Sequence, residues 1–553
     1  MRNSLDSGRM RRNCRKAFRK HKWMKIMIRH MEIYSESWKK LPWKKFQKDL
    51  FRLQKRVFKA VREGNKQKAR NLQKLILKSQ AARFIAIRQV TQLNAGKKTA
   101  GIDGKKSLNY KERFELEEHL KTNADNWKHQ KLREIPIPKK DGTTRMLKVP
   151  TMADRAWQCL VKLALEPAQV ATFHARSYGF RTGRSAHDAL KVLWLNLNRK
   201  AKGKEKRVLE LDIEKCFDRI SHNTIMSELI APKSIKIGIF RCLKSGVNPE
   251  FPDQGTPQGG VVSPLLANIA LNGIESLLKG SKRDKRIANP CVRYADDMVF
   301  ILKPDDSAAE LLQKIEEFLA QRGMKISEKK TKLTATTDGF DFLGWHIKVQ
   351  DNGKFRCTPS EENFKAFKKK VKAIVNNSNY GAKVKAKKLA PIVRGWRNYH
   401  KHCKMDGSRF SLWSISYRAY KVFNKEAKQN KQSAKKLVKQ AFPAVSWSQV
   451  KLSAIKGSKS PYDGDLIYWS ERNSKLYDGM TARILKKQHH TCGKCGLKLL
   501  SNERIHLHHK DGNHQNWKLR NLEALHQSCH QYYHMSNRTS GAGCDESRTS
   551  GSN

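Results

Sequence analysis

Two adjacent carboxylates, Asp296 and Asp297, lie within the string RYADDMVF at residues 293–300. Strand-favouring side chains flank them, so the segment predicts a hairpin with Ala295 and Asp296 in the turn. Two like charges at one hairpin tip are unfavourable unless a cation offsets them, and their oxygen atoms favour Mg²⁺ or Mn²⁺. Such ions commonly act on substrate phosphates. An Asp-Asp dipeptide alone is more often a solvated turn than a metal site. Other features of the sequence are needed to distinguish these alternatives.

A third carboxylate, Asp212, lies on a separate predicted strand within RVLELDIEKCFD. Leu209, Leu211 and Ile213 alternate with Glu210 and Asp212, which predicts a half-buried strand with Asp212 on its polar face. If this strand pairs beside the hairpin, the three carboxylates can hold two Mg²⁺ ions about 3.5–4 Å apart. One ion would then activate an attacking hydroxyl, and the other would stabilise the leaving pyrophosphate.

A glycine-rich loop lies between the two acidic segments. Gly255, Gly259 and Gly260 precede an apolar helical pattern that begins at Ser263 and extends to Leu277. Glycine lets the backbone approach another chain closely, including a nucleic-acid strand. The loop alone is weak evidence, but its place between the acidic strands suits a site that handles nucleotides.

Cysteine and histidine pairs mark a separate module near the C-terminus. Cys492 and Cys495 form one pair, and His526 and Cys529 form a second pair with the same spacing. These pairs predict a structural Zn²⁺ site of the Cys₃His type. Two alternatives stay open: free thiols, and an ion that His526 shares with His530, one helical turn away.

The charge balance of the chain points to a polyanionic partner. Lys and Arg number 114 against 50 Asp and Glu, a formal net charge of +64 over 553 residues. This imbalance opposes compaction unless a polyanion neutralises it, and nucleic acid is the leading candidate. The longest uncharged stretch, 254–274, contains Pro, Gln and Asn and does not predict a membrane span. Most of the 11 cysteines are scattered singly, which is typical of a reducing compartment.

Several longer motifs carry a family resemblance, and they occur in that family's order. The chain resembles the reverse transcriptases encoded by group II introns, also called maturases, over roughly residues 36–535. The segment PIVRGWRNYHKHC (391–403) resembles the maturase domain of that family, and residues 505–534 resemble an HNH (His-Asn-His) endonuclease. The other motifs are TAGIDG (99–104), IPKKDGTTRMLKVPTMADR (137–155), SYGFRTGRSAHDAL (177–190), LDIEKCFDRISH (211–222), GTPQGGVVSPLLANIAL (255–271), RYADDMVF (293–300), SEKKTKL (327–333) and FDFLGW (340–345).

The resemblance implies an α+β fold. It consists of a right-hand polymerase with fingers and palm, followed by an α-helical thumb (maturase) domain and a small zinc-containing HNH ββα-metal nuclease module. The implied domains are a basic N-terminal extension (1–35), an N-terminal helical region of the reverse transcriptase (36–100), fingers and palm (101–355), thumb (356–450), a DNA-binding linker region (451–485), the HNH endonuclease (486–535) and a disordered tail (536–553).

In the palm, the resemblance makes Asp212, Asp296 and Asp297 both the catalytic residues and the ligands of two Mg²⁺ ions. Phe217 would lie under the sugar and exclude a 2′-hydroxyl, although plain core packing is an alternative for it. Other side chains would contact the triphosphate, template or primer, and for the basic ones a solvated or phosphate-backbone role is about as frequent. These predicted substrate-binding residues are Lys139, Arg145, Arg181, Gln258 and Lys330.

In the nuclease module, the resemblance assigns His509 as the general base that activates water. His508, His530 and His534 would hold one divalent ion, and Asn521 would orient the backbone and His509. The zinc site would comprise Cys492, Cys495, His526 and Cys529. A purely structural zinc finger without cleavage is the alternative.

The thumb combines positive charge with aromatic residues. Residues 361–440 contain 22 Lys and Arg but only 4 Asp and Glu. Lys and Arg can bind RNA phosphates, and aromatic rings can stack on unpaired bases. Trp and Tyr on a helix are more often core residues, so the positive surface is the firmer prediction.

The resemblance as a whole implies an RNA-directed DNA polymerase that binds the RNA of its own intron to assist splicing. It also implies that the enzyme nicks target DNA to prime synthesis. Its partners would be intron RNA in a ribonucleoprotein, target DNA and dNTPs, without a membrane, in a bacterial cytoplasm near the nucleoid or in an organelle. Two rival hypotheses are an RNA chaperone for splicing with silent enzymatic parts and a site-specific DNA nuclease with a basic body.

Overall fold

The computed structural model describes residues 33–138, 142, 144–246, 250–278, 290–405, 409–426, 431–444, 454–457, 459–474, 477, 479–499 and 505–537. The chain divides into two compact units, each described by itself: unit 1 is 1–172, 222–269 and 460–553, and unit 2 is 173–221 and 270–459. Apart from 33–35 and 536–537, the predicted extension 1–35 and tail 536–553 lie outside the described residues, as does Lys139. The other predicted domain limits stay predictions.

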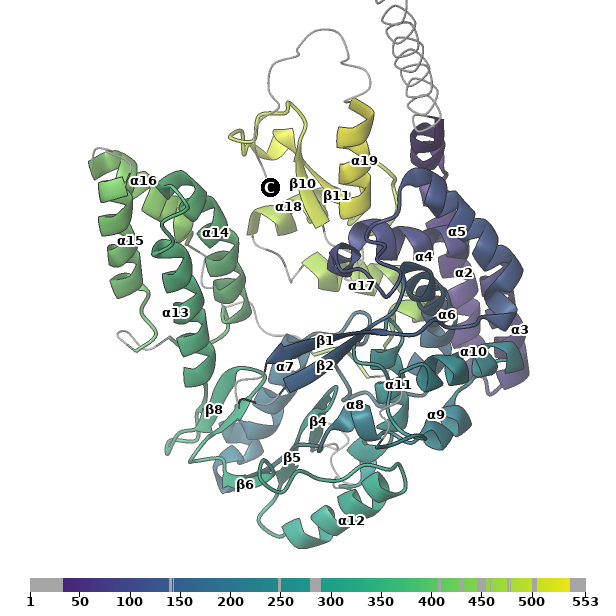
Figure 1. Cartoon of the computed structure of the whole chain (residues 1–553). Coiled ribbons are helices and arrows are strands. Elements are labelled where there is room, and N and C mark those ends of the chain that lie inside the picture. Colours follow the sequence, from purple (N-terminus) through teal and green to yellow (C-terminus); the bar gives the residue numbers. More distant parts are fainter. Residues whose placement is uncertain are drawn as a thin grey trace, which may run out of the picture. The chain divides into compact units, whose positions relative to one another are not determined.

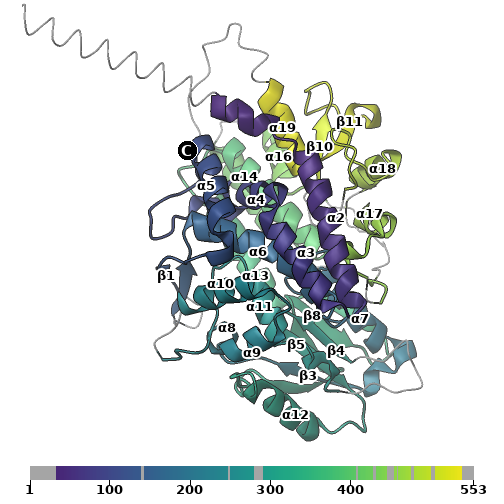
Figure 2. The ribbon, with the colours of Figure 1, turned by 90° about the vertical axis from the view of Figure 1, so that its right-hand side faces the viewer.

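Unit 1 begins with α2 (Trp43–Arg62), α3 (Lys66–Lys78), α4 (Gln80–Arg88), η1 (Gln89–Leu93), η2 (Ala95–Lys98), α5 (Tyr110–Asn123), η3 (Ala124–Asn126) and α6 (Met152–Val170). Apolar residues at helical spacing, such as Phe46 and Leu50, are buried along α2. Gly64 takes φ +78° after α2, and the Asn65 side chain caps α3 by accepting from the Lys68 amide. The expected helical character of this region is therefore confirmed, and α2 and α3 run side by side (Figure 2).

A hairpin and three helices complete the fingers part of unit 1. β1 (Arg133–Pro138) pairs antiparallel with β2 (Thr144–Val149), and the helices are α9 (His222–Glu228), α10 (Lys233–Lys244) and α11 (Ser263–Ala270). The predicted helix from Ser263 to Leu277 is too long. It ends at Ala270 because Gly273 takes φ +106°, and the separate 3₁₀ turn η6 (Ile274–Ser276) follows.

Unit 2 is built on a four-stranded antiparallel sheet, the palm sheet, in the order β4-β5-β3-β6. Its strands are β3 (Arg207–Leu211), β4 (Cys291–Tyr294), β5 (Asp297–Leu302) and β6 (Lys332–Ala335). Most side chains of β4 and β5 are buried, because both faces of the sheet are covered. α12 (Ala308–Ala320) lies beside the sheet in Figure 1 and Figure 2, and it buries Leu311, Ile315 and Leu319 along one face.

The other face of the palm sheet shares a core with a helix and a second sheet. Val208 of β3 and Val299 of β5 belong to one buried cluster with Leu193 of α7 (Ala186–Leu197) and Trp345 of β8 (Trp345–Val349). β8 lies between β7 (Phe340–Phe342) and β9 (Phe355–Pro359) in a three-stranded sheet. The short elements of this region are η4 (Arg199–Ala201), η5 (Gly203–Glu205) and α8 (Cys216–Arg219).

Four helices after the second sheet form the thumb: α13 (Glu361–Val375), α14 (Ala382–Tyr399), α15 (Trp413–Glu426) and α16 (Lys431–Ala441) (Figure 1). They surround an apolar core that includes Phe367, Leu389 and Phe423. Lys385 is fully buried, and its ammonium forms an ion pair with Glu426. The thumb is therefore a small helical bundle whose charge lies mainly on its outside.

The C-terminal part of unit 1 contains η7 (Pro461–Asp463), α17 (Leu466–Ser474), α18 (Gly479–Lys487), β10 (Ile505–His509), η8 (Leu519–Asn521), β11 (Leu522–His526) and α19 (Gln527–Asn537). β10 and β11 pair antiparallel, and both contact α19. Together they form a ββα unit around a core that includes Ile484, Leu499 and Leu525. Across the described residues, none of the helices has the length and apolar character that crossing a membrane requires.

Candidate active sites

The palm sheet brings the three predicted aspartates to one edge. Leu211 pairs with Met298 and Tyr294 pairs with Asp297, so Asp212, which directly follows Leu211, comes opposite Asp297. Side chains opposite each other across an antiparallel pair lie on the same face of the sheet. Asp296 occupies the adjoining turn. The strand pairing on which the sequence-based hypothesis depended is therefore present.

The turn that carries Asp296 is held by close backbone contacts. Ala295 takes the left-handed conformation, with φ +61°, and the Arg293 guanidinium donates a hydrogen bond of 3.1 Å to the Ala295 carbonyl. A Cβ at Gly179 would come within 2.2 Å of the Ala295 amide nitrogen. Only glycine fits at position 179, because any side chain there would push the Ala295 backbone away. The close approach therefore helps to position the turn that carries Asp296.

A buried ion pair supports the same hairpin from inside. Arg293 and Glu275 are both fully buried, and their side chains meet at 2.6 Å. The Arg293 guanidinium also donates to the Ser177 hydroxyl at 2.9 Å. Burial by itself would raise the pKa of Glu275, but the Arg293 charge outweighs it and the pKa is lowered. The pair was not predicted from the sequence. An arginine within an otherwise apolar strand indicates that a buried counter-charge exists, but it does not identify Glu275 as the partner.

The charges at the palm edge repel one another. The pKa of Asp297 is raised to about 6, first by loss of surrounding solvent and then by the like charges of Asp296 and Asp212, while Lys330 lowers it. Asp297 is nevertheless reached by solvent, so the like-charge repulsion is the firmer of the two causes. The Lys330 ammonium lies 3.1 Å from an Asp212 carboxylate oxygen. The trio is not among the described groups whose ligand atoms all approach within 4.8 Å.

Two other predicted palm residues differ in exposure. Phe217 is half-buried on the short helix α8, which begins directly after the turn at Lys215. A half-buried ring is compatible with a floor under a sugar, and also with packing. Arg181 is only 6% exposed, and its guanidinium donates to the carbonyls of His174 and Ser177 at 2.7 and 2.9 Å. This placement favours support of the 174–177 loop over a direct contact with substrate.

Two of the predicted substrate-binding residues, Arg145 of the finger hairpin and Gln258 of the glycine-rich loop, contact each other. The exposed Arg145 guanidinium on β2 donates to the Gln258 side-chain carbonyl. The Lys148 amide donates to the Gln258 main-chain carbonyl at 2.7 Å. A Cβ at Gly259, where φ is +124°, would lie 2.7 Å from the Lys148 carbonyl oxygen. The glycine-rich loop therefore packs against the finger hairpin, and Arg145 and Gln258 form one cluster there, which we call the finger cluster.

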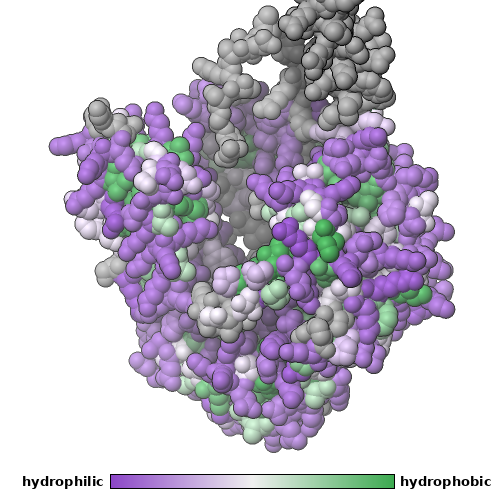
Figure 3. Space-filling model, viewed as in Figure 1, coloured by the Kyte–Doolittle hydropathy of each residue, from purple (hydrophilic) through white to green (hydrophobic). Residues whose placement is uncertain are grey.

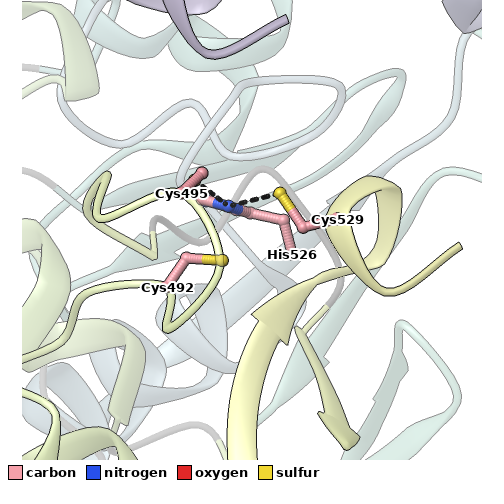
Figure 4. Close-up of side chains that lie close together, drawn as sticks. All are labelled: Cys492, Cys495, His526 and Cys529. Atoms are coloured by element: carbon pink, nitrogen blue, oxygen red, sulfur yellow. Dashed lines mark hydrogen bonds between the residues drawn. The ribbon is translucent and has the colours of Figure 1, made fainter. Parts of the chain in front are cut away.

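The C-terminal module brings its cysteines and one histidine together. The side chains of Cys492, Cys495, His526 and Cys529 converge (Figure 4), and their ligand atoms all lie within 4.8 Å of one another. The His526 Nδ1 atom is 3.4 Å from the Cys495 sulfur and 3.8 Å from the Cys529 sulfur. Three sulfurs and one imidazole nitrogen at this spacing fit the tetrahedral Zn²⁺ of a structural site. His526 therefore groups with the thiols and not with His530.

Three histidines form a second cluster in the same module. Ligand atoms of His508, His530 and His534 also lie within 4.8 Å of one another, and the His530 and His534 Nε2 atoms are 3.2 Å apart. The pKa of His530 is lowered to about 4, first by burial and then by the neighbouring histidines. Burial likewise lowers the pKa of His508. Neutral imidazoles at this spacing fit one divalent ion, because the neutral ring is the form that binds metal.

His509 and Asn521 lie in the same ββα unit: His509 ends β10 directly after His508, and Asn521 ends η8. His509 is buried, and its Nε2 atom has no hydrogen-bond partner among the described residues. The Asn521 amide donates to the Asp511 carboxylate at 2.9 Å, its side-chain oxygen accepts from the Asp511 amide at 3.1 Å, and its carbonyl accepts from the Lys510 amide. Asn521 thus fixes the turn that follows His509, while the His509 ring packs against Trp517.

Comparison with known proteins shows which families share this arrangement. The family model for reverse transcriptase (RNA-dependent DNA polymerase) matches residues 137–347, and that for the N-terminal domain of reverse transcriptase matches 38–120. The group II intron maturase-specific domain matches residues 364–442. The reverse transcriptase match covers the palm sheet, β2 and the last two residues of β1, and the maturase match covers most of the four-helix bundle, so the polymerase part of the predicted fold is confirmed. The matched ranges end at residue 442, before the ββα unit.

Individual relatives agree with these matches. Maturase-like protein 1 of Euglena gracilis is 40% identical over 402 residues, which cover 72% of this chain and 85% of that protein. Protein YkfC of Escherichia coli is 30% identical and is covered over 78% of its length. The group II intron-encoded protein LtrA of Lactococcus lactis is 26% identical, and the match spans about half of it (53%).

A solved structure of telomerase from Candida albicans aligns with 58% of this chain and 62% of that chain at 14% identity, with a TM-score of 0.31. A likeness of that size carries no argument. The sequence relatives and the three domain matches do: the chain belongs to the family of group II intron-encoded reverse transcriptases and maturases.

Proposed function

We propose that this chain copies RNA into DNA and binds the RNA of a group II intron to assist its splicing. The observation that carries the proposal is the strand register that sets Asp212 opposite Asp297, beside Asp296, within a reverse transcriptase domain. These three carboxylates would hold Mg²⁺, which activates the primer hydroxyl and stabilises the leaving pyrophosphate. The chain's own residues set the spacing of the acids through the sheet and hold their turn through Arg293.

The finger cluster supports the same proposal. Arg145 presents an exposed guanidinium next to Gln258 on a glycine-rich loop, which suits a charge-assisted contact with a nucleotide phosphate. Lys330 would exchange its ion pair with Asp212 for contacts with the nucleotide or its metal. Phe217 would limit the space at the sugar.

Primer extension on an RNA template tests the polymerase assignment. The double substitution Asp296→Asn and Asp297→Asn should lower Mg²⁺-dependent dNTP incorporation by at least about a hundredfold, because it removes ionised metal ligands without changing size. Asp351→Asn is the matched control, since the Asp351 side chain is 99% exposed in a turn. Incorporation by the double variant at the parent rate would refute the palm assignment. Absence of extension by the parent, with splicing fully stimulated, would favour an RNA chaperone.

We further propose that the C-terminal module is a metal-dependent DNA endonuclease that nicks target DNA to expose a primer. Support comes from the ββα unit, which gathers His508, His530 and His534 around one point and leaves the His509 Nε2 atom without a partner among the described residues. The three histidines would hold one divalent ion, which polarises the scissile phosphate. His509 would take the proton from the attacking water, and Asn521 would hold its turn.

Nicking of a DNA duplex that carries the intron insertion sequence tests this second activity. His509→Ala should lower nicking by about 10²- to 10⁴-fold, the usual contribution of a general base, while extension from an exogenous primer continues. The control is His346→Ala. This removes a surface histidine of β8 that pairs with Asp341 of β7. If His509→Ala nicks DNA as fast as the parent, the module does not catalyse nicking through His509, and the alternative of a purely structural zinc finger is favoured. Nicking by the parent without any primer extension would instead favour a chain that is only a nuclease.

A further inference from the structure

The thumb exposes a run of aromatic side chains that its core does not use. Trp413 is 69% exposed and Tyr417 is 45% exposed, and Tyr420 is half-buried beside them on α15. The core of the bundle takes Ile415, Ala419 and Phe423 from another side of the same helix. Because positions i, i+4 and i+7 share one helical face, the three aromatic residues form a continuous surface.

This surface, which we call the aromatic ladder (Trp413, Tyr417 and Tyr420), is already arranged for stacking. The Trp413 and Tyr417 rings are nearly parallel, with an interplanar angle of 4° and centroids 5.3 Å apart. Tyr417 and Tyr420 follow at 23° and 6.4 Å. Because most of Trp413 is open to solvent, a further flat ring can continue the stack there, as bases do on aromatic platforms.

A groove lies beside the ladder between α15 and α16. It has a volume of about 720 Å³, and its lining combines the ladder with apolar residues and cations, including Arg397, Lys435 and Lys439. No Asp or Glu is among the lining residues, and Lys421 lies 4.9 Å from the centre of the Tyr417 ring. Figure 3 shows the same region at the upper left as a hydrophilic surface interrupted by paler and apolar patches. This volume is in the range of sites that hold a small ligand or a few linked rings.

The chemistry of the groove selects its occupant. Exposed lysines at positions 435 and 439 lie one turn apart on α16 and can follow a phosphate backbone. Stacking needs a base whose faces are free, which excludes the interior of a duplex. The whole groove lies within the maturase-specific domain match, 364–442. We infer that the aromatic ladder and its groove bind unpaired nucleotides of RNA, with bases on Trp413 and Tyr417 and phosphates on Lys435 and Lys439.

This inference rests on the proposed binding of intron RNA and adds the site and the form of RNA bound there. The test uses the full chain and three labelled probes: a short oligouridylate, an RNA hairpin with the same number of phosphates, and the matching oligothymidylate. Binding is measured by fluorescence anisotropy. A bromouridine version of the single-stranded probe is photocrosslinked, and the attachment sites are mapped by mass spectrometry.

The expected result separates stacking from charge. The double variant Trp413→Ala and Tyr417→Ala should bind the oligouridylate about 5- to 100-fold more weakly, as expected for the loss of one or two base stacks. Its affinity for the hairpin should change less than about threefold. The variant Trp413→Phe and Tyr417→Phe keeps flat rings and should retain most of the affinity. Trp194→Ala, which removes another exposed tryptophan from α7 outside the maturase domain, should bind as the parent does.

Several outcomes would overturn the inference while leaving RNA binding by the chain intact. These are an alanine variant that binds the oligouridylate like the parent, crosslinks that avoid residues 413–420, and an equal loss for the hairpin. If the alanine variant loses affinity for the oligothymidylate but not for the oligouridylate, the ladder binds single-stranded DNA and not RNA. If the parent bound none of the RNA probes, the proposed function itself would fail, which is a different result from failure of the ladder.

Discussion

The palm and the C-terminal module each gather three side chains that fit a metal, but they do so by different means. The palm draws Asp212 and Asp297 from separate strands, and the hairpin is held by the buried Arg293–Glu275 pair. The module draws its histidines from one hairpin and the helix that follows it. Ligand atoms of the three histidines all lie within 4.8 Å of one another, and those of the three acids do not. The palm site therefore depends on strand register and a buried ion pair, whereas the histidine site depends on one hairpin and the helix after it.

The largest difference is expected when the thiol site, whose ligands fit zinc, loses one of them. Cys492→Ala takes one ligand from the thiol site, and structural zinc commonly contributes about 10–16 kcal/mol of folding free energy. We expect zinc content to fall, residues 479–537 to become sensitive to protease, and nicking to be lost while primer extension persists. The palm variant Asp296→Asn and Asp297→Asn should keep its full zinc content. Protease resistance of the Cys492→Ala module would show that its small core folds without the ion.

A smaller effect should follow from breaking the buried pair of the palm. Glu275→Gln leaves the Arg293 charge buried without its counter-ion, which typically costs about 3–5 kcal/mol. We expect amide hydrogen exchange across residues 291–302 to accelerate accordingly, and exchange in β10 and β11 to stay unchanged. Asp253→Asn, which breaks the exposed pair with Lys244, is the control and should leave exchange across these residues unchanged, because exposed ion pairs contribute little. Equal effects of the two substitutions would contradict a structural role for the buried pair.

The smallest effect concerns acidity. The raised pKa of Asp297, about 6, means that about half of this carboxylate is protonated near pH 6, and the protonated form binds cations less well. The lowered pKa of His530, about 4, keeps that imidazole neutral at the same pH. Between pH 8 and pH 6, the Mg²⁺ concentration for half-maximal extension should rise roughly two- to tenfold, while the metal requirement of nicking changes less. Parallel metal titrations of the two activities would measure this, and equal shifts would remove the contrast.

Much of this arrangement is predictable because its signals are local. The alternation from Leu209 to Ile213 places Asp212 on a strand, and the aspartate pair within an apolar hairpin places Asp296 in a turn. The longer-range contacts are not predictable in that way. Nothing in the spacing of Glu275 indicates that it pairs with Arg293, because their pairing depends on how the chain folds between them.

Two ambiguities show where spacing misleads. His526 and His530 are four residues apart and read as neighbours on one helix, but His526 is the last residue of β11 and the helix begins after it. Its imidazole therefore faces the thiols. Spacing likewise places Trp413 and Tyr417 on one face of α15 without saying whether that face is core or surface. The exposed fractions decide it, because the opposite apolar residues already fill the bundle.

The position of His526 couples two sites through a single peptide bond. Its ring groups with the sulfurs, and the next residue starts the helix that carries His530 and His534. An oxidant that modifies those sulfurs would destabilise the N-terminal end of α19 and so disturb the proposed nuclease site. The strands that carry the aspartates lie elsewhere in the chain, so primer extension should persist. If the chain has both proposed activities, peroxide titration should therefore abolish nicking at doses that leave primer extension intact.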